Sequence, residues 1–174
     1  MNLLGLSGSL RDASLNTQLL RAAAEAAGAG SFILADLRLP LYDGDIEAAG
    51  LPESVSTLID QVRAADAVLI ATPEYNKGLS GVLKNALDWL SRSQPLPLKD
   101  KPAAIMSAAA GRGGGEVAQF MLRQCLVSHA PRLVAGPMVA IGAAHEAFEG
   151  GALRDEMARK LLADQMTALR ALIG

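Results

Sequence analysis

Residues 67–71 have the sequence AVLIA, an apolar run without polar alternation near the middle of the chain. Such a run is typical of a strand that is covered on both faces, as in a parallel sheet. From Leu79 to Leu90, apolar residues then recur at steps of three and one, which is helical spacing. Residues 67–90 therefore predict a buried central strand followed by a helix.

The same order of strand and helix is repeated on both sides of this stretch. Short apolar runs predict further strands at residues 3–6, 32–35, 103–106 and 133–141. Helical periodicity predicts further helices from Leu15 to Ala26, from near Pro52, after the glycine-rich residues 111–115, and from about Leu153. A loop is expected around residues 40–45, and Pro137 within the last strand indicates the edge of a sheet.

Five strands alternating with five helices in 174 residues predict a doubly wound α/β fold. Because β-α-β crossovers are right-handed, few strand orders remain. We expect a five-stranded parallel sheet of order 2-1-3-4-5 with helices on both faces. The length favours one domain that spans residues 1–174.

The composition excludes several classes of protein. Hydrophobic residues make up 51% of the chain and charged residues 20%, which favours a buried core over disorder. The formal net charge of −2 is too small to attract nucleic acid or an acidic membrane surface, and no apolar window approaches the roughly 20 residues of a membrane span. Cys125 is the only cysteine, which excludes an internal disulfide and favours the reducing cytoplasm.

In doubly wound sheets, ligands bind beyond the carboxyl ends of the strands. The first loop there, residues 7–17, combines hydroxyls, an amide and the guanidinium of Arg11 at a turn from strand to helix. A phosphate monoester needs such donors together with the amides of a helix N-terminus. The alternative is that Ser14 or Asn16 only caps the helix. Neither G-x-x-x-x-G-K-[ST] nor G-x-G-x-x-G is present, so a terminal phosphate fits better than a triphosphate or a dinucleotide pyrophosphate.

The second loop, residues 73–81, suits a flat heterocycle. Its backbone groups can contact a polar ring edge beside Tyr75, and two glycines allow a close approach. The alternative is that Pro73 and Asn76 only form a turn and that Tyr75 covers the surface.

The third loop, residues 107–115, consists almost entirely of small residues. Small side chains leave room for a ring or a second ligand against the backbone. Arg112 in this loop either attracts the phosphate of a reduced nicotinamide nucleotide or is solvated.

Other polar residues have less specific patterns. His129 and His145 are the only histidines, and their spacing indicates neither a catalytic triad nor a metal site, so we expect structural roles for both. Lys84, Asn85 and Asp88 lie within a predicted helix and are candidates only for a subunit interface.

Two motifs stand out in the first and second loops. They are G-S-L-R-x-x-S-x-N at residues 8–16, and P-E-Y-N at residues 73–76 followed by G-V-L-K-N-A-L-D-W at residues 81–89. By these motifs the chain resembles the flavodoxin-like NADPH-dependent FMN reductases, which include the soluble quinone, azo and chromate reductases. The resemblance spans nearly the whole chain and implies the flavodoxin-like fold.

The resemblance implies that FMN is bound by residues of all three loops. The residues implied to hold its phosphate are Ser9, Arg11, Ser14, Asn16 and Thr17. Those implied to contact the flavin and the ribityl chain are Pro73, Glu74, Tyr75 and Asn76, with Ser107 near the other edge of the ring. The chain departs from its relatives at residues 77–80, where they often have an aromatic or small apolar residue and a proline. This departure concerns the shape of the substrate rather than FMN binding.

The resemblance also implies the reaction. Because the flavin carries the hydride chemistry, neither a catalytic side chain nor a metal is expected. NADPH or NADH would reduce bound FMN and leave, and a flavin, quinone, azo, nitro or metal-oxyanion acceptor of the chromate type would then take the electrons at the same face, in ping-pong order. Relatives further imply a homodimer or homotetramer, for which residues 79–90 and 143–148 are interface candidates.

Two other functions stay open. A flavodoxin-type electron carrier would bind FMN without NAD(P)H activity, but such carriers tend to be acidic and rich in aromatics at the ring, whereas this chain has a charge of −2 and only 3 Phe, 2 Tyr and 1 Trp. A non-enzymatic FMN-binding protein would use the fold as a scaffold. A phosphatase is disfavoured, because the first loop has no cysteine nucleophile and Cys125 falls within a predicted helix.

Overall fold

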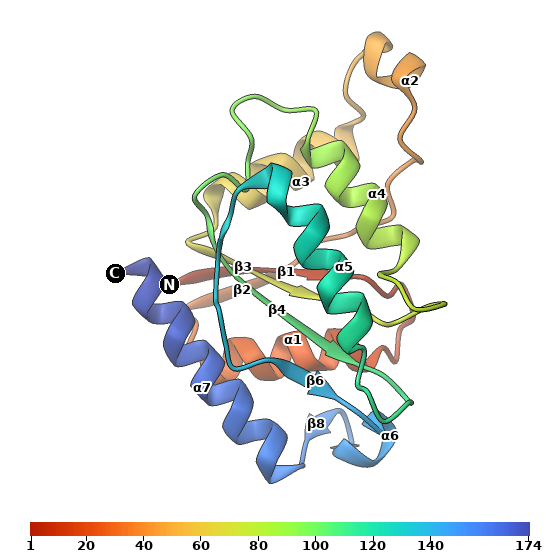
Figure 1. Cartoon of the computed structure of the whole chain (residues 1–174). Coiled ribbons are helices and arrows are strands. Elements are labelled where there is room, and N and C mark those ends of the chain that lie inside the picture. The colour runs from red at the N-terminus through yellow and green to blue at the C-terminus, as the bar shows by residue number, and fades with distance from the viewer.

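The computed structural model describes residues 1–174 and confirms a flavodoxin-like, doubly wound parallel sheet with helices on both faces (Figure 1). The sheet has the order β2-β1-β3-β4, and β5 and β6 both pair with β4 at the far edge. The predicted order 2-1-3-4-5 is therefore confirmed. The strands are β1 (Asn2–Ser7), β2 (Ser31–Leu34), β3 (Ala67–Ala71), β4 (Pro102–Ala108), β5 (Arg132–Leu133) and β6 (Val139–Ile141).

The longer helices divide between the two faces of the sheet. One apolar cluster includes α1 (Leu15–Ala26) and α7 (Glu156–Ile173), and the other includes α3 (Glu53–Ala64), α4 (Gly81–Leu90) and α5 (Glu116–Leu126). None of the helices combines the length and hydropathy needed to cross a membrane. The shorter elements are α2 (Gly44–Ala49), a 3₁₀ turn (Val127–His129), α6 (Ala144–Ala147) and a hairpin of β7 (Phe148–Glu149) and β8 (Ala152–Leu153).

Both apolar clusters depend on β3. Leu69 belongs to the cluster of α1 and α7, whereas Val68 and Ile70 belong to the cluster of α3 and α4, and all three side chains are fully buried. Burial of each such side chain contributes roughly 1.5–3 kcal/mol. Because successive side chains of a strand point to opposite faces, a strand between two helical layers must be apolar at every position. This explains the unbroken apolar run at residues 67–71.

The expected strand at residues 133–141 is not continuous, and in this respect the prediction was wrong. It forms β5 and β6, which pair with β4 on either side of residues 134–138. Pro137 has no N–H to donate to a strand partner, so the ladder is interrupted around it. Both pieces lie at the sheet edge, as Pro137 indicates.

The last helix begins slightly later than expected. Leu153 belongs to β8, and Asp155 caps α7 by accepting a hydrogen bond from the N–H of Ala158 at 2.7 Å. A side-chain oxygen at the N-cap satisfies an amide that has no partner within the helix. The helix therefore begins at Glu156.

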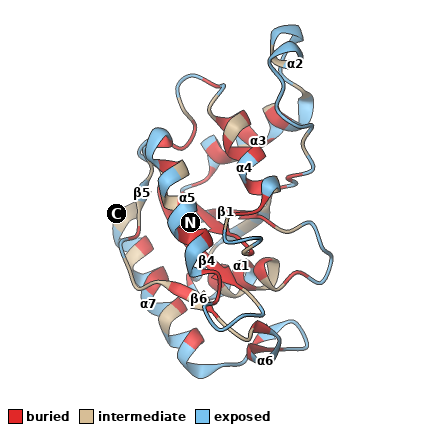
Figure 2. Cartoon of the chain, turned by 45° about the vertical axis from the view of Figure 1, so that its right-hand side comes forward, coloured by how far each residue is buried: buried red, intermediate tan, exposed pale blue.

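The loop expected around residues 40–45 lies in a longer segment, residues 36–52, which contains α2 and projects from the body of the molecule (Figure 2). α2 itself has no buried residue. The base of the segment is fixed by α4, because Trp89 Nε1 and Asn85 Nδ2 both donate to the carbonyl of Pro40, and Asn85 Oδ1 accepts from the N–H of Tyr42. The side chain of Asn85 therefore holds this segment of its own chain, rather than facing a second subunit as a candidate interface residue.

His129 is a buried histidine at the end of the 3₁₀ turn. It is 3% exposed, and its Nδ1 has no hydrogen-bond partner. Burial lowers the pKa of His129, while the nearby Asp88 carboxylate opposes this and Lys84 adds to it. The fold therefore favours the neutral imidazole.

We expect the free energy of unfolding to decrease as the pH falls from about 7 to about 5. In the unfolded chain His129 takes up a proton near its ordinary pKa of about 6.5, whereas the folded chain resists this, so protons favour unfolding. Denaturant titrations at several pH values should show a flatter pH dependence for His129→Gln. His145→Gln is the control, because His145 is exposed. If the free energy of unfolding of His129→Gln depends on pH as steeply as that of the wild type, His129 is not the source of the pH dependence.

Candidate functional site

Three loops follow β1, β3 and β4 at the carboxyl edge of the sheet. The first two lie in direct contact, because the N–H of Gly8 donates to the carbonyl of Ala71 at 2.8 Å. A Cβ on Gly8 would lie 2.6 Å from Oγ of Ser80, the residue that caps α4 through the N–H of Leu83. Glycine at this position therefore lets the first loop pack against the second.

Asn16 joins the first loop to the end of β4. Its buried side chain donates to the carbonyl of Ala108 at 2.9 Å and accepts from the N–H of Ala108 at 3.0 Å. Ser14 accepts from the N–H of Thr17 at 3.2 Å and is the N-cap of α1. Ser14 therefore caps the helix, whereas Asn16 makes a tertiary contact.

Ser9, Arg11 and Thr17 line a cavity of about 340 Å³ between the first loop and the residues that follow β2, together with Arg21 and Arg38. Within residues 8–17, the backbone N–H groups without an acceptor in the protein are those of Leu10, Asp12, Ala13, Leu15 and Asn16. α1 has no acidic residue in its first turn. The carboxylates of Asp12 and Asp36 also line the cavity, and Asp36 pairs with Arg38. Of the unpaired N–H groups, those of Leu10 and Asp12 belong to lining residues. An anion at the first loop would meet these donors, the guanidinium of Arg11 and the positive end of a helix dipole.

The second loop forms a tight turn at its tip. Tyr75 and Gly78 exchange two backbone hydrogen bonds of 3.0 Å around Asn76 and Lys77. These two residues have φ values of 49° and 65°, the left-handed conformation that such a two-residue turn requires. The turn-forming role of Asn76 is therefore confirmed. Tyr75 and Asn76 are exposed while Pro73 is buried, so a planar ligand could reach the first two from solvent.

Glu74 joins the second loop to α5. Its carboxylate accepts from the N–H of Ala118 at 3.3 Å and lies 3.5 Å from Nζ of Lys77. The N-cap position of α5 is Gly115, which offers no side-chain acceptor. Glu74 therefore stabilises this helix N-terminus from a different loop and fixes the distance between the second and third loops.

Ser107 is fully buried and holds the third loop. Its hydroxyl donates to the carbonyl of Gly114 at 2.6 Å and accepts from Nε2 of Gln119 at 2.8 Å. The same Nε2 donates to the carbonyl of Val139 at 2.8 Å. The sequence analysis did not identify Gln119 as a functional residue. Its position could have indicated one, because Gln119 lies three residues before Leu122 and therefore on the buried side of α5, where a polar amide needs a partner.

Comparison with known proteins identifies the family. The sequence model of a family described as NADPH-dependent FMN reductase matches residues 1–146. The chain is 46% identical to an NAD(P)H-dependent FMN reductase of Pseudomonas aeruginosa over 173 aligned residues. The aligned region covers 98% of this chain and 94% of that protein. The chain belongs to the NADPH-dependent FMN reductase family.

Two further similarities agree with this family. The chain is 44% identical to a quinone reductase of Escherichia coli over 128 aligned residues. The aligned region covers 70% of this chain and 67% of that protein. The fold matches FerB, a flavoenzyme NAD(P)H:(acceptor) oxidoreductase from Paracoccus denitrificans, with a TM-score of 0.89 and 34% identity over 99% of this chain and 96% of that one. The family is one of oxidoreductases with FMN as the flavin and NAD(P)H as the electron donor.

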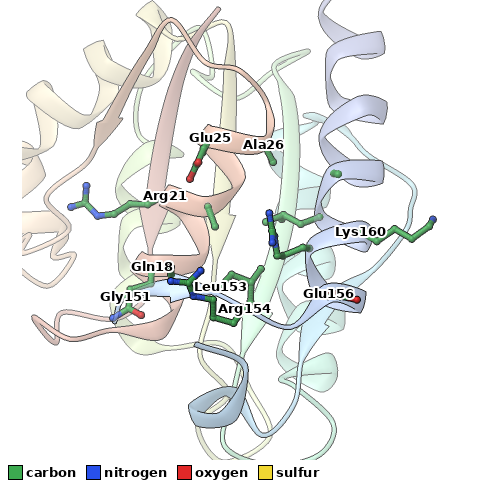
Figure 3. Close-up of a pocket in the computed structure, with 14 residues that line it drawn as sticks. Gln18, Arg21, Glu25, Ala26, Gly151, Leu153, Arg154, Glu156 and Lys160 are labelled. Carbon is green, nitrogen blue, oxygen red and sulfur yellow. The ribbon is translucent and has the colours of Figure 1, made fainter. Parts of the chain in front are cut away.

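A larger cavity than the one at the first loop lies away from these loops. A groove of about 750 Å³ lies between α1, the turn before α7 and α7 itself. Its lining mixes arginine and lysine with Glu25 and Glu156, and Arg21 and Lys160 extend in opposite directions away from it (Figure 3). These charges do not converge on one position. We therefore do not take the groove as the candidate site, although it is larger than the cavity at the first loop.

Replacing Gly8 with alanine should weaken the contact between the first and second loops. The new Cβ would displace Oγ of Ser80 from the N–H of Leu83, and loss of such a cap costs about 1–2 kcal/mol. Gly81→Ala is the matched control, because nothing lies within 4 Å of a Cβ at that position. Urea unfolding should show a clear loss of stability for Gly8→Ala and none for Gly81→Ala. Equal stability of the two variants would show that the loops tolerate a Cβ.

Proposed function

We propose that residues 1–174 form one FMN-binding domain that takes electrons from NADPH or NADH and passes them to a small-molecule acceptor. The main support is the set of unpaired N–H donors at the start of α1, beside Ser9, Arg11 and Thr17. A phosphate monoester carries nearly two negative charges near neutral pH and accepts several hydrogen bonds at once. The donors of the first loop match this requirement.

The proposed phosphate-binding residues divide into two roles. Ser9, Arg11 and Thr17 would contact the phosphate directly, together with the amides at the start of α1. Ser14 and Asn16 would position these amides, because one caps the helix and the other fixes its first turn to β4.

The residues proposed for the flavin divide in the same way. Pro73, Tyr75 and Asn76 would contact the ring and the ribityl chain. Glu74 and Ser107 would set the width of the space for the ring through their bonds to α5 and Gly114. When bound, FMN supplies the hydride chemistry, for which the protein provides position and electrostatics.

We propose flavins, quinones, azo dyes, nitro compounds and metal oxyanions such as chromate as acceptors. The relative in Escherichia coli that is named quinone reductase supports the quinone class. Donor and acceptor would use the exposed side of the second loop in turn, which gives ping-pong kinetics. Arg112 is exposed and has no ion-pair partner, so it could contact a phosphate of the nicotinamide nucleotide. The single cysteine supports a cytoplasmic location.

The test of this function is spectroscopic and kinetic. The purified protein should be yellow and should lose its flavin absorbance under anaerobic NADPH. Double-reciprocal plots of NADPH against a quinone should give parallel lines. A bound flavin without NADPH oxidation would favour an electron carrier, and a colourless protein that does not bind added FMN would exclude the proposal.

Arg11→Ala should weaken FMN binding. Loss of one hydrogen bond to a charged group costs about 1.5–3 kcal/mol, which corresponds to roughly a 10- to 150-fold higher Kd. Quenching of FMN fluorescence by apoprotein measures this Kd. Arg159→Ala, an exposed arginine on α7, is the control and should bind FMN like the wild type. Unchanged affinity in Arg11→Ala would place the phosphate elsewhere.

We also propose a homodimer or homotetramer in which α5 packs against α5 of a second copy. Val117, Phe120 and Met121 form an exposed apolar stripe along this helix. In an antiparallel pair, Glu116 at one end of the stripe would lie near Arg123 of the other helix, and the reverse pair would form at the other end. The stripe would thus meet an identical apolar stripe between complementary charges.

The segments expected at an interface from sequence offer less apolar surface than α5. On α4, Lys84 and Asp88 form an ion pair of 2.6 Å at the surface. In the segment 143–148, Ala144, Ala147 and Phe148 are buried. We therefore assign the main contact to α5.

Phe120→Asp should dissociate the assembly, because it would bury a carboxylate between the two helices. Sedimentation velocity should show a dimer or tetramer for the wild type and a smaller species for the variant. Met157→Asp, on the exposed side of α7, is the control and should sediment like the wild type. A monomeric wild type, or a variant that assembles normally, would contradict the proposed interface.

A further inference from the structure

Lys77 lies at the tip of the second loop, directly after the residues proposed to contact the flavin. Its φ of 65° is in the left-handed region, where glycine or asparagine would be less strained than lysine. A strained residue at the edge of a site points to a role for its side chain. Lys77 is also the first of the four residues, 77–80, at which the chain departs from the pattern of its relatives.

The ammonium group of Lys77 has one carboxylate partner, which neutralises its charge only in part. The carboxylate within 4 Å of it belongs to Glu74, at 3.5 Å. That carboxylate also accepts from the N–H of Ala118, so the positive end of α5 offsets part of its charge. The side chain of Lys77 is 82% exposed and that of Glu74 17%. Glu74 therefore restricts the position of the lysine while the positive charge faces solvent.

We propose that Lys77 makes this reductase favour acceptors that carry an anionic group, such as a sulfonate or carboxylate, next to the reducible ring. The inference rests on the proposed function, because it places the acceptor beside residues 73–76. A cation at the mouth of a site raises the local concentration and the association rate of anions, and salt screens this attraction. An uncharged acceptor has no such advantage.

The experiment compares 1,4-naphthoquinone-2-sulfonate with uncharged 1,4-naphthoquinone as acceptors of the holoenzyme at saturating NADPH. Lys77→Glu reverses the charge, and Lys77→Asn removes it with a residue that tolerates the left-handed turn. Lys99→Glu is the matched control, because it makes the same change in net charge at an exposed position. Lys99 precedes β4 and so lies at the amino end of the strands, whereas the candidate site lies at their carboxyl end.

We expect Lys77→Glu to lower kcat/KM for the sulfonated quinone about 5- to 10-fold, and Lys77→Asn to give an intermediate loss. Both variants should reduce the uncharged quinone within about twofold of the wild type, and Lys99→Glu should match the wild type with both quinones. The preference of the wild type should also shrink as salt is raised.

Two results would overturn the inference and leave the proposed function intact. They are an equal loss with both quinones in the Lys77 variants, and no loss with the sulfonated quinone. If wild-type holoenzyme reduces neither quinone with NADPH, the proposed function and the inference both fail.

Discussion

The candidate site depends on hydrogen bonds that join loops across neighbouring strands. The N–H of Gly8 extends the pairing of β1 with β3 by one residue, through the carbonyl of Ala71. Asn16 spans a greater distance, because α1 follows β1 while Ala108 ends β4, and β3 lies between those two strands. These bonds fix the unpaired amides of α1 relative to the second and third loops. A ligand anchored by a phosphate at α1 would therefore have its other end set against those loops.

The motif at residues 8–16 combines structural and binding residues. Gly8, Ser14 and Asn16 are committed to contacts within the protein, whereas Ser9 and Arg11 face the cavity. The spacing of the motif is therefore set by two requirements at once. The turn must pack against the second loop, cap α1 and reach β4, and it must still leave its other donors without partners. Both requirements therefore constrain the same nine residues.

Local patterns were sufficient to predict most of the fold, because burial acts on each strand and helix separately. The run at residues 67–71 and the helix capped by Ser14 follow from periodicity and capping alone. The partners of Glu74 and Ser107 could not be predicted in this way, since Ala118 and Gln119 lie in a different part of the chain and approach only when the sheet forms. The helix within residues 36–52 escaped prediction for the opposite reason. It buries no residue of its own, so it leaves no apolar periodicity in the sequence.

Shifted pKa values indicate where a fold perturbs its ionisable groups, and sites of acid–base catalysis often contain them. In this chain a hydrogen bond to Glu47 raises the pKa of Tyr42, and burial lowers the pKa of Lys101 and of His129. All three residues lie outside the three loops of the candidate site. In the family of this chain, FMN is the flavin, and a flavin carries hydride chemistry for which the protein supplies position. Changes at Gly8 or Asn16 would act on the geometry of the first loop, because these residues join it to Ala71 and Ala108.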